Sequence, residues 1–180
     1  MNSIIRSTLV VATLLFSIAT NAGTQVLGFE IGVSTHELVQ TALKRKTIIR
    51  EVAVDQNRFD GSILATNGES YEIEGLLEVF YIFDRDKRLA AITMVMNTYK
   101  FDAVFQALSA KYRVLSKDIP FVGSKSARFE GSDDGVIVLN APHLGHVMNV
   151  TYTDRGFEEA VVGKMKKESD ERRRREAGKF

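Results

Sequence analysis

The chain has 180 residues, of which 44% are hydrophobic, and its 24 basic and 23 acidic side chains give a formal net charge of +1. This length fits one domain with short extensions, and the apolar fraction is that of an ordinary globular core. Cysteine is absent from the sequence, which excludes disulfides, thiolate zinc sites and cysteine nucleophiles.

Residues 1–22 are expected to be an export signal. Arg6 is the one charge in the first seven residues, and a largely apolar run extends from Thr8 to Ile18. Small residues lead up to Ala22, where cleavage is expected. The apolar run is about half the roughly 20 residues that a membrane-spanning helix needs, so we expect no transmembrane segment after processing. An exported protein without cysteine fits a bacterial periplasm better than a eukaryotic secretory route, so we expect a periplasmic location.

The first helix is predicted after a short strand at Gly28 to Gly32. Ser34 is expected to be its N-cap, with Glu37 completing a capping box and Val33 and Leu38 forming a hydrophobic staple. His36 is then expected to face solvent in the first turn. The predicted buried stripe consists of Leu38, Val39, Ala42 and Leu43.

Strand signals follow the first helix. Thr47 to Val54 is rich in β-branched residues, Arg58 to Thr66 is a strand or a loop, and Ser70 to Glu74 is a short alternating piece. Leu77 to Phe83 and Leu89 to Met96 flank a polar turn and predict a hairpin. Both hairpin strands have apolar residues on both faces, which is typical of central strands covered on two sides. A helix would cover one side, and a second copy of the chain could cover the other.

The second helix is predicted over Phe101 to Tyr112. Its apolar residues recur at helical spacing: Phe101, Val104, Phe105, Leu108 and Tyr112. The expected cover for this stripe is the alternating strand His146 to Thr153. Further strands are predicted in the second half, at Val114 to Ile119, Ser126 to Glu130 and Val136 to Leu139.

The two halves of the chain repeat one order of elements, a helix followed by a meander of strands. We therefore interpret residues 23–154 as one α+β domain with an antiparallel sheet and both helices packed on one face. The alternative is an ordinary α+β domain with two helices and no repeat. Residues 155–180 are expected to form a charged, partly helical tail.

The opening Gly32-Val33-Ser34 before a capped helix, together with the helix-plus-meander order, resembles small exported modules of the β-lactamase-inhibitor-protein-like and outer-membrane-assembly-lipoprotein-like type. The resemblance implies a protein that binds other proteins and has no catalytic residues. The lipidated cysteine of the lipoprotein group is absent from this sequence, so membrane attachment is not implied.

The tail concentrates positive charge. Residues 164–180 contain eight basic and four acidic side chains, including the run Arg172, Arg173, Arg174 and Arg175. One interpretation of this pattern is a solvated tail. The other is a tail that contacts an anionic surface or an acidic partner. Aromatic residues are not interleaved with these charges, so we expect no nucleic acid partner.

No catalytic, cofactor or metal motif stands out. His143 and His146 are spaced like metal ligands, but Pro142 and Gly145 place them in a loop without a third ligand. The acidic clusters, such as Asp133-Asp134, are typical of turns. We therefore expect a non-enzymatic binding module of the bacterial envelope, acting on a protein or an apolar ligand through Phe80, Tyr81 and Ile82. The alternative is a small periplasmic hydrolase whose carboxylates and histidines converge only in the fold.

Overall fold

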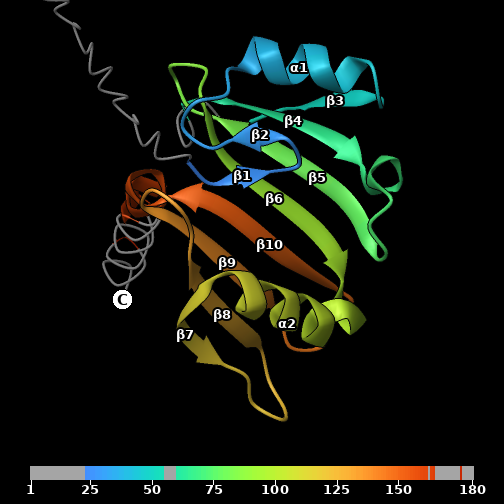
Figure 1. The fold of residues 1–180 in the computed structure, drawn as a ribbon, viewed down its shortest axis with the longest axis vertical. Coiled ribbons are helices and arrows are strands. Elements are labelled where there is room, and N and C mark those ends of the chain that lie inside the picture. The colour runs from blue at the N-terminus through green and yellow to red at the C-terminus, as the bar shows by residue number, and fades with distance from the viewer. Residues whose placement is uncertain (1–22, 55–59, 162, 165–174, 176–180) are drawn as a thin grey trace, which may run out of the picture.

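The computed structural model describes residues 23–54, 60–161, 163–164 and 175. The main feature is an eight-stranded sheet in which every neighbouring pair is antiparallel. Its spatial order is β3-β4-β5-β6-β10-β9-β8-β7 (Figure 1). The strands are β3 (Ile49–Val52), β4 (Ser62–Asn67), β5 (Leu76–Phe83), β6 (Leu89–Asn97), β7 (Arg113–Asp118), β8 (Lys125–Glu130), β9 (Gly135–Ala141) and β10 (Val147–Asp154). The predicted α+β class is confirmed.

The predicted order of elements is present twice. Helix α1 (His36–Lys44) precedes β3 to β6, and helix α2 (Phe101–Lys111) precedes β7 to β10. The last strands of the two units, β6 and β10, pair at the centre of the sheet, with Thr93 opposite Thr151. The strand order reads symmetrically outward from this pair, which fits two copies of one unit related by an approximate two-fold axis. The Leu77 to Phe83 and Leu89 to Met96 hairpin is β5 and β6.

Ring contacts place both helices on one face of the sheet. Phe105 of α2 lies 5.8 Å from Phe129 of β8, and His36 of α1 lies 4.7 Å from Phe83 of β5, centroid to centroid. A small hairpin, β1 (Gln25–Val26) and β2 (Phe29–Glu30), covers the space between the helices, with Phe29 edge-on to Tyr81 at 5.6 Å. Figure 1 shows α1, α2 and this hairpin on the same side of the sheet.

The covered face carries the core. Its central row of side chains is apolar and almost fully buried, and it runs from Leu64 through Tyr81, Ile92, Tyr152 and Ile137 to Phe129. The α2 residues Phe101 and Leu108 are buried against it, and Val104, Phe105 and Tyr112 pack on it half-buried. The predicted α2 stripe is therefore confirmed, although its ring contact is to β8 rather than to the expected strand His146 to Thr153.

Three details of α1 differ from the prediction. Thr35 is the N-cap, and its Oγ1 accepts a hydrogen bond from the Leu38 amide at 3.3 Å. Ser34 is buried one residue earlier, and its Oγ accepts from the Glu30 amide at 3.0 Å, which ties the helix start to β2. His36 is half-buried against Phe83 rather than facing solvent. Val39 and Leu43 are buried as predicted, but Leu38 is exposed.

A third helix begins after β10. Asp154 caps it by accepting a hydrogen bond from the Phe157 amide at 2.7 Å, and residues 155–161 are helical. The predicted export signal and most of the basic tail, including Arg172, Arg173 and Arg174, lie outside the described residues. Within the described part of the chain, no helix has the length and apolar character needed to cross a membrane.

Candidate functional site: the open face of the sheet

The face of the sheet opposite α1 and α2 carries an apolar patch. Side chains alternate along each strand, so the residues between the core positions point to this second face. On β4, β5, β6 and β9, five of them are hydrophobic and half-buried, and we call them the open-face patch: Ile63, Phe80, Ile82, Val95 and Val138. The register joins them across the sheet, because Ile63 pairs with Ile82, and Phe80 and Val138 are linked through Thr93 and Thr151.

The structure separates the three residues that the sequence grouped together. Phe80 and Ile82 belong to the open-face patch, whereas Tyr81 points into the core and is 0% exposed. The Tyr81 hydroxyl shares a hydrogen bond with the Tyr71 hydroxyl at 2.8 Å, and Tyr71 in turn bonds Thr66 Oγ1 at 2.6 Å. Burial first, and then the bond to Tyr71, raises the pKa of Tyr81. Tyr81 is therefore a structural residue that cannot contact a partner on the open face.

A hollow of about 590 Å³ lies beside the patch, over the β3–β6 half of the sheet. Val95 of the patch lines it together with Ala65, and Ile48 and Leu77 stand at its border. Ile48 is 89% exposed and Leu77 is 42% exposed, so the apolar surface extends beyond the patch toward the start of β3. Exposed apolar residues that cluster beside a half-buried patch are typical of a contact surface.

Ion pairs border the apolar surface on two sides. Arg50 of β3 pairs with Glu78 of β5 at the hollow. On the other half of the sheet, Arg128 of β8 donates two hydrogen bonds to the Glu158 carboxylate of the third helix, at 2.6 and 2.8 Å. Through Glu158 this helix contacts the open face. An apolar centre with a charged border is the usual composition of a protein–protein interface.

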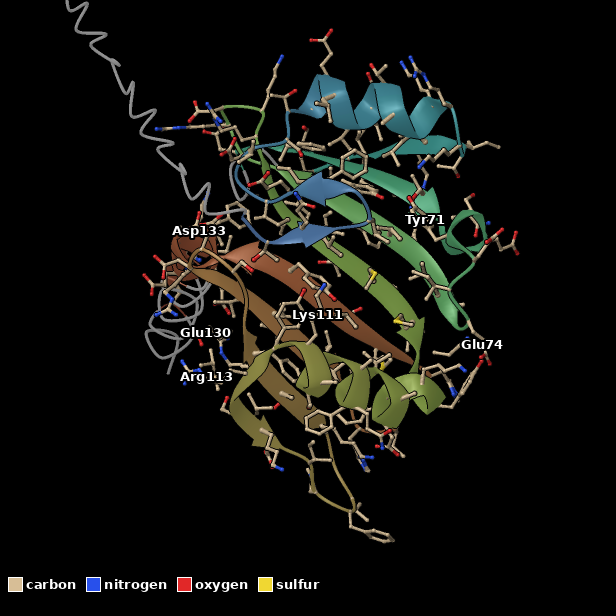
Figure 2. The ribbon with its side chains drawn as sticks, viewed as in Figure 1. Tyr71, Glu74, Lys111, Arg113, Glu130 and Asp133 are labelled. Atoms are coloured by element: carbon tan, nitrogen blue, oxygen red, sulfur yellow. The ribbon has the colours of Figure 1, made fainter. Side chains whose placement is uncertain are left out.

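Glu74, Glu130 and Asp133 do not converge on one site (Figure 2). Arg113 binds both oxygens of Glu130, at 2.5 and 2.7 Å, and this hydrogen bonding lowers the pKa of Glu130. Glu74 pairs with Lys100 at 2.5 Å. Figure 2 shows Glu74 on the side of the molecule far from Glu130 and Asp133, so these carboxylates do not face one another across a cleft.

The histidines do not assemble a site with these acids. His143 and His146 are exposed, and the His143 backbone amide is held by Ser124 Oγ at 3.0 Å. Among the described residues, no group of three or more histidine, aspartate or glutamate side chains is placed to hold a metal ion. Of the predicted arginine contacts, Arg175 alone is described, and it is exposed in a helical segment.

The sequence could indicate an uncovered apolar strand face but not its full extent. Ile63 and Val138 come from strands that are distant in the sequence, so no spacing links them to Phe80. Ile48 lies just before β3, and no sequence pattern marks it as exposed. Comparison of the chain with protein-family models, curated proteins and solved structures finds no significant match.

Proposed function

We propose that this protein is a non-enzymatic binding module of the bacterial envelope that holds a protein partner on the open face of its sheet. The observation that carries the proposal is the open-face patch. Its five hydrophobic side chains lie on the sheet face opposite both helices, next to exposed Ile48 and Leu77. Covering such a surface gains about 25 cal/mol for each Å² of apolar area removed from water.

The proposed location follows from the sequence. The apolar run at Thr8 to Ile18 and the small residues before Ala22 support an exported protein, and the absence of cysteine suits the periplasm. The resemblance to β-lactamase-inhibitor-protein-like and outer-membrane-assembly-lipoprotein-like modules is a further proposal. It rests on the two helix-plus-meander units, and it also favours a protein partner over a substrate.

The proposal is tested by capture of partners from an envelope extract of the source organism. Phe80→Ser combined with Ile82→Ser should abolish capture while leaving the thermal unfolding temperature close to that of the wild type. The matched control is Phe121→Ser, because Phe121 is a fully exposed aromatic residue in the β7–β8 loop, away from the patch. Equal capture by the wild type and the double variant would exclude the open face as the binding surface.

A second copy of the chain is the competing occupant. Sedimentation equilibrium of the purified protein separates the two cases. A concentration-dependent dimer that Phe80→Ser disrupts would make the open face a homodimer contact and would contradict a separate envelope partner on this surface.

We also propose that the basic tail reaches an anionic surface. Its eight basic side chains in residues 164–180 support the proposal, because each basic residue near an anionic membrane contributes about 1 kcal/mol. Removal of residues 164–180 should lower binding to vesicles that contain anionic lipid, and unchanged binding would rule out the tether. Vesicles of neutral lipid are the control.

A further inference from the structure

A cavity of about 210 Å³ lies on the covered side of the sheet, between α1, the β1–β2 hairpin and the 3₁₀ helix Gly68–Tyr71. Its apolar wall is formed by Leu27, Phe29, Ala42 and Leu43, and its polar wall by Lys46, Thr47, Ser70 and Tyr71. None of these residues belongs to the open-face patch. The cavity is therefore a separate feature of the molecule, and nothing said of the open face depends on it.

The cavity has a buried apolar end and an exposed polar end. Phe29 and Leu43 are almost fully buried, whereas Lys46 and Ser70 are exposed. A ligand would therefore place an apolar part against Phe29 and Leu43 and a polar part near Lys46. Tyr71, labelled in Figure 2, contributes a hydroxyl that already bonds Thr66 and Tyr81, and Ser70 Oγ donates to Thr47 Oγ1 at 2.8 Å.

The charge around the polar end favours an anion. The C-terminal end of a helix carries about half a negative charge, which by itself would attract a cation. Lys44 lies in the last turn of α1, and Arg45 and Lys46 follow directly, so three successive basic residues outweigh that partial charge several-fold. Of these three, Lys46 alone lines the cavity. Its ammonium group is the one positioned to pair with an anionic group of a ligand.

The volume limits the size of the ligand. An engineered apolar cavity of about 150 Å³ is large enough to bind benzene, and sites for drug-sized molecules begin near 300 Å³. A cavity of about 210 Å³ therefore fits one aromatic ring or one short alkyl chain. We propose that it binds a small amphipathic anion, with its ring or chain between Phe29 and Leu43 and its carboxylate at Lys46.

The proposal is tested with three six-carbon probes that carry different head groups: hexanoate, hexan-1-ol and hexylammonium. Each is titrated into the ¹⁵N-labelled protein and followed by amide chemical shifts. Saturable shifts should appear at residues around the cavity, such as Leu27, Leu43 and Thr47. Hexanoate should bind about three- to fivefold more tightly than hexan-1-ol, as expected for one partly exposed ion pair, and hexylammonium should bind most weakly.

Two variants and one control complete the test. Lys46→Gln should lower the affinity for hexanoate to that for hexan-1-ol, and Lys44→Gln, which removes an equal charge outside the cavity, should have a much smaller effect. Ala42→Leu should fill the cavity and weaken all three probes. If Ala42→Leu does not fold, Lys46→Gln still decides the question. Hexylammonium binding as tightly as hexanoate, or no saturable shift around the cavity, would overturn the proposal.

Discussion

The two faces of the sheet differ in how they are covered, although both are rich in apolar residues. On the face toward α1 and α2, Tyr81, Ile92, Ile137 and Phe129 are completely buried. On the other face, the five residues of the open-face patch are half-buried, and the third helix reaches the sheet through the pair of Arg128 and Glu158. The comparison shows that the apolar residues of one strand are not all buried in the core. On one face these residues are sealed in the core, and on the other the five residues of the patch keep part of their surface in water.

The largest expected effect comes from truncating matched aromatic residues on the two faces. Phe129→Ala removes a fully buried ring that contacts Phe105, and it should lower the free energy of unfolding by about 3–5 kcal/mol. Phe80→Ala on the open face should cost about 1 kcal/mol, because the ring is already partly in water. Urea unfolding measures both values. Equal losses would mean that the two faces are equally covered in solution.

A second pair of variants, each lacking one hydroxyl, compares the stability that a hydrogen bond contributes on the two faces. Tyr81→Phe deletes the buried partner of Tyr71 and should cost about 1 kcal/mol, with Tyr71 keeping its bond to Thr66. Thr151→Val removes the half-buried hydroxyl that lies 3.1 Å from Thr93 Oγ1 on the open face, where water can replace it. Its expected cost is less than about 0.5 kcal/mol. A larger loss for Thr151→Val in thermal unfolding would contradict the assignment of the faces.

The helices α1 and α2, which cover the core side of the sheet, differ in how their first turns are capped. Substitution of each N-cap residue tests this difference. Thr35→Ala should destabilise α1 by about 1 kcal/mol, because the Leu38 amide loses its acceptor. No side chain caps α2, whose N-cap residue is Lys100. Lys100→Ala should therefore leave the amide exchange rates in the first turn of α2 unchanged. Hydrogen exchange resolved by residue checks both variants, and faster exchange in α2 for Lys100→Ala would refute the assignment.

The smallest expected effect concerns the pair of Arg113 and Glu130 at the sheet edge. Hydrogen bonding from Arg113 holds the pKa of Glu130 below its ordinary value. The pair therefore stabilises the fold fully above the unfolded-state pKa of glutamate, about 4.3, and less as the pH falls through the lower folded-state value. The difference in thermal unfolding temperature between the wild type and Glu130→Gln should be small at neutral pH and vanish in acid. A difference that grows in acid would contradict this sign.

Much of the fold could be predicted from local patterns. The β5–β6 hairpin, both helices and the strands of the second half appear close to their predicted ranges, because turn residues and periodicity are local signals. The N-cap of α1 is Thr35, one residue later than predicted. Ser34 and Thr35 are both good caps, but the Ser34 hydroxyl is occupied by its contact with β2. The start of α1 is also fixed by a bridge between Thr35 and Arg88, which are far apart in the chain, and no sequence spacing indicates that contact.

The candidate site was predictable only in part. Alternation along β5 places Phe80 and Ile82 on one face and Tyr81 on the other, but both sets are apolar, so the sequence does not say which face the helices cover. The cavity beneath α1 could not be predicted, because its walls come from segments around Leu27, Ala42 and Ser70 that only the fold brings together.

The most direct test of the account is hydroxyl-radical footprinting of side chains, in the purified protein and again after addition of the envelope extract. The account predicts that Phe80 and Ile82 are labelled in the purified protein, whereas Phe129 and Tyr81 are protected. It also predicts that the extract protects Phe80 and Ile82 while Phe121 stays labelled. Unchanged labelling of Phe80 and Ile82, with protection appearing at Phe121 instead, would contradict the claim that the open face is the binding surface.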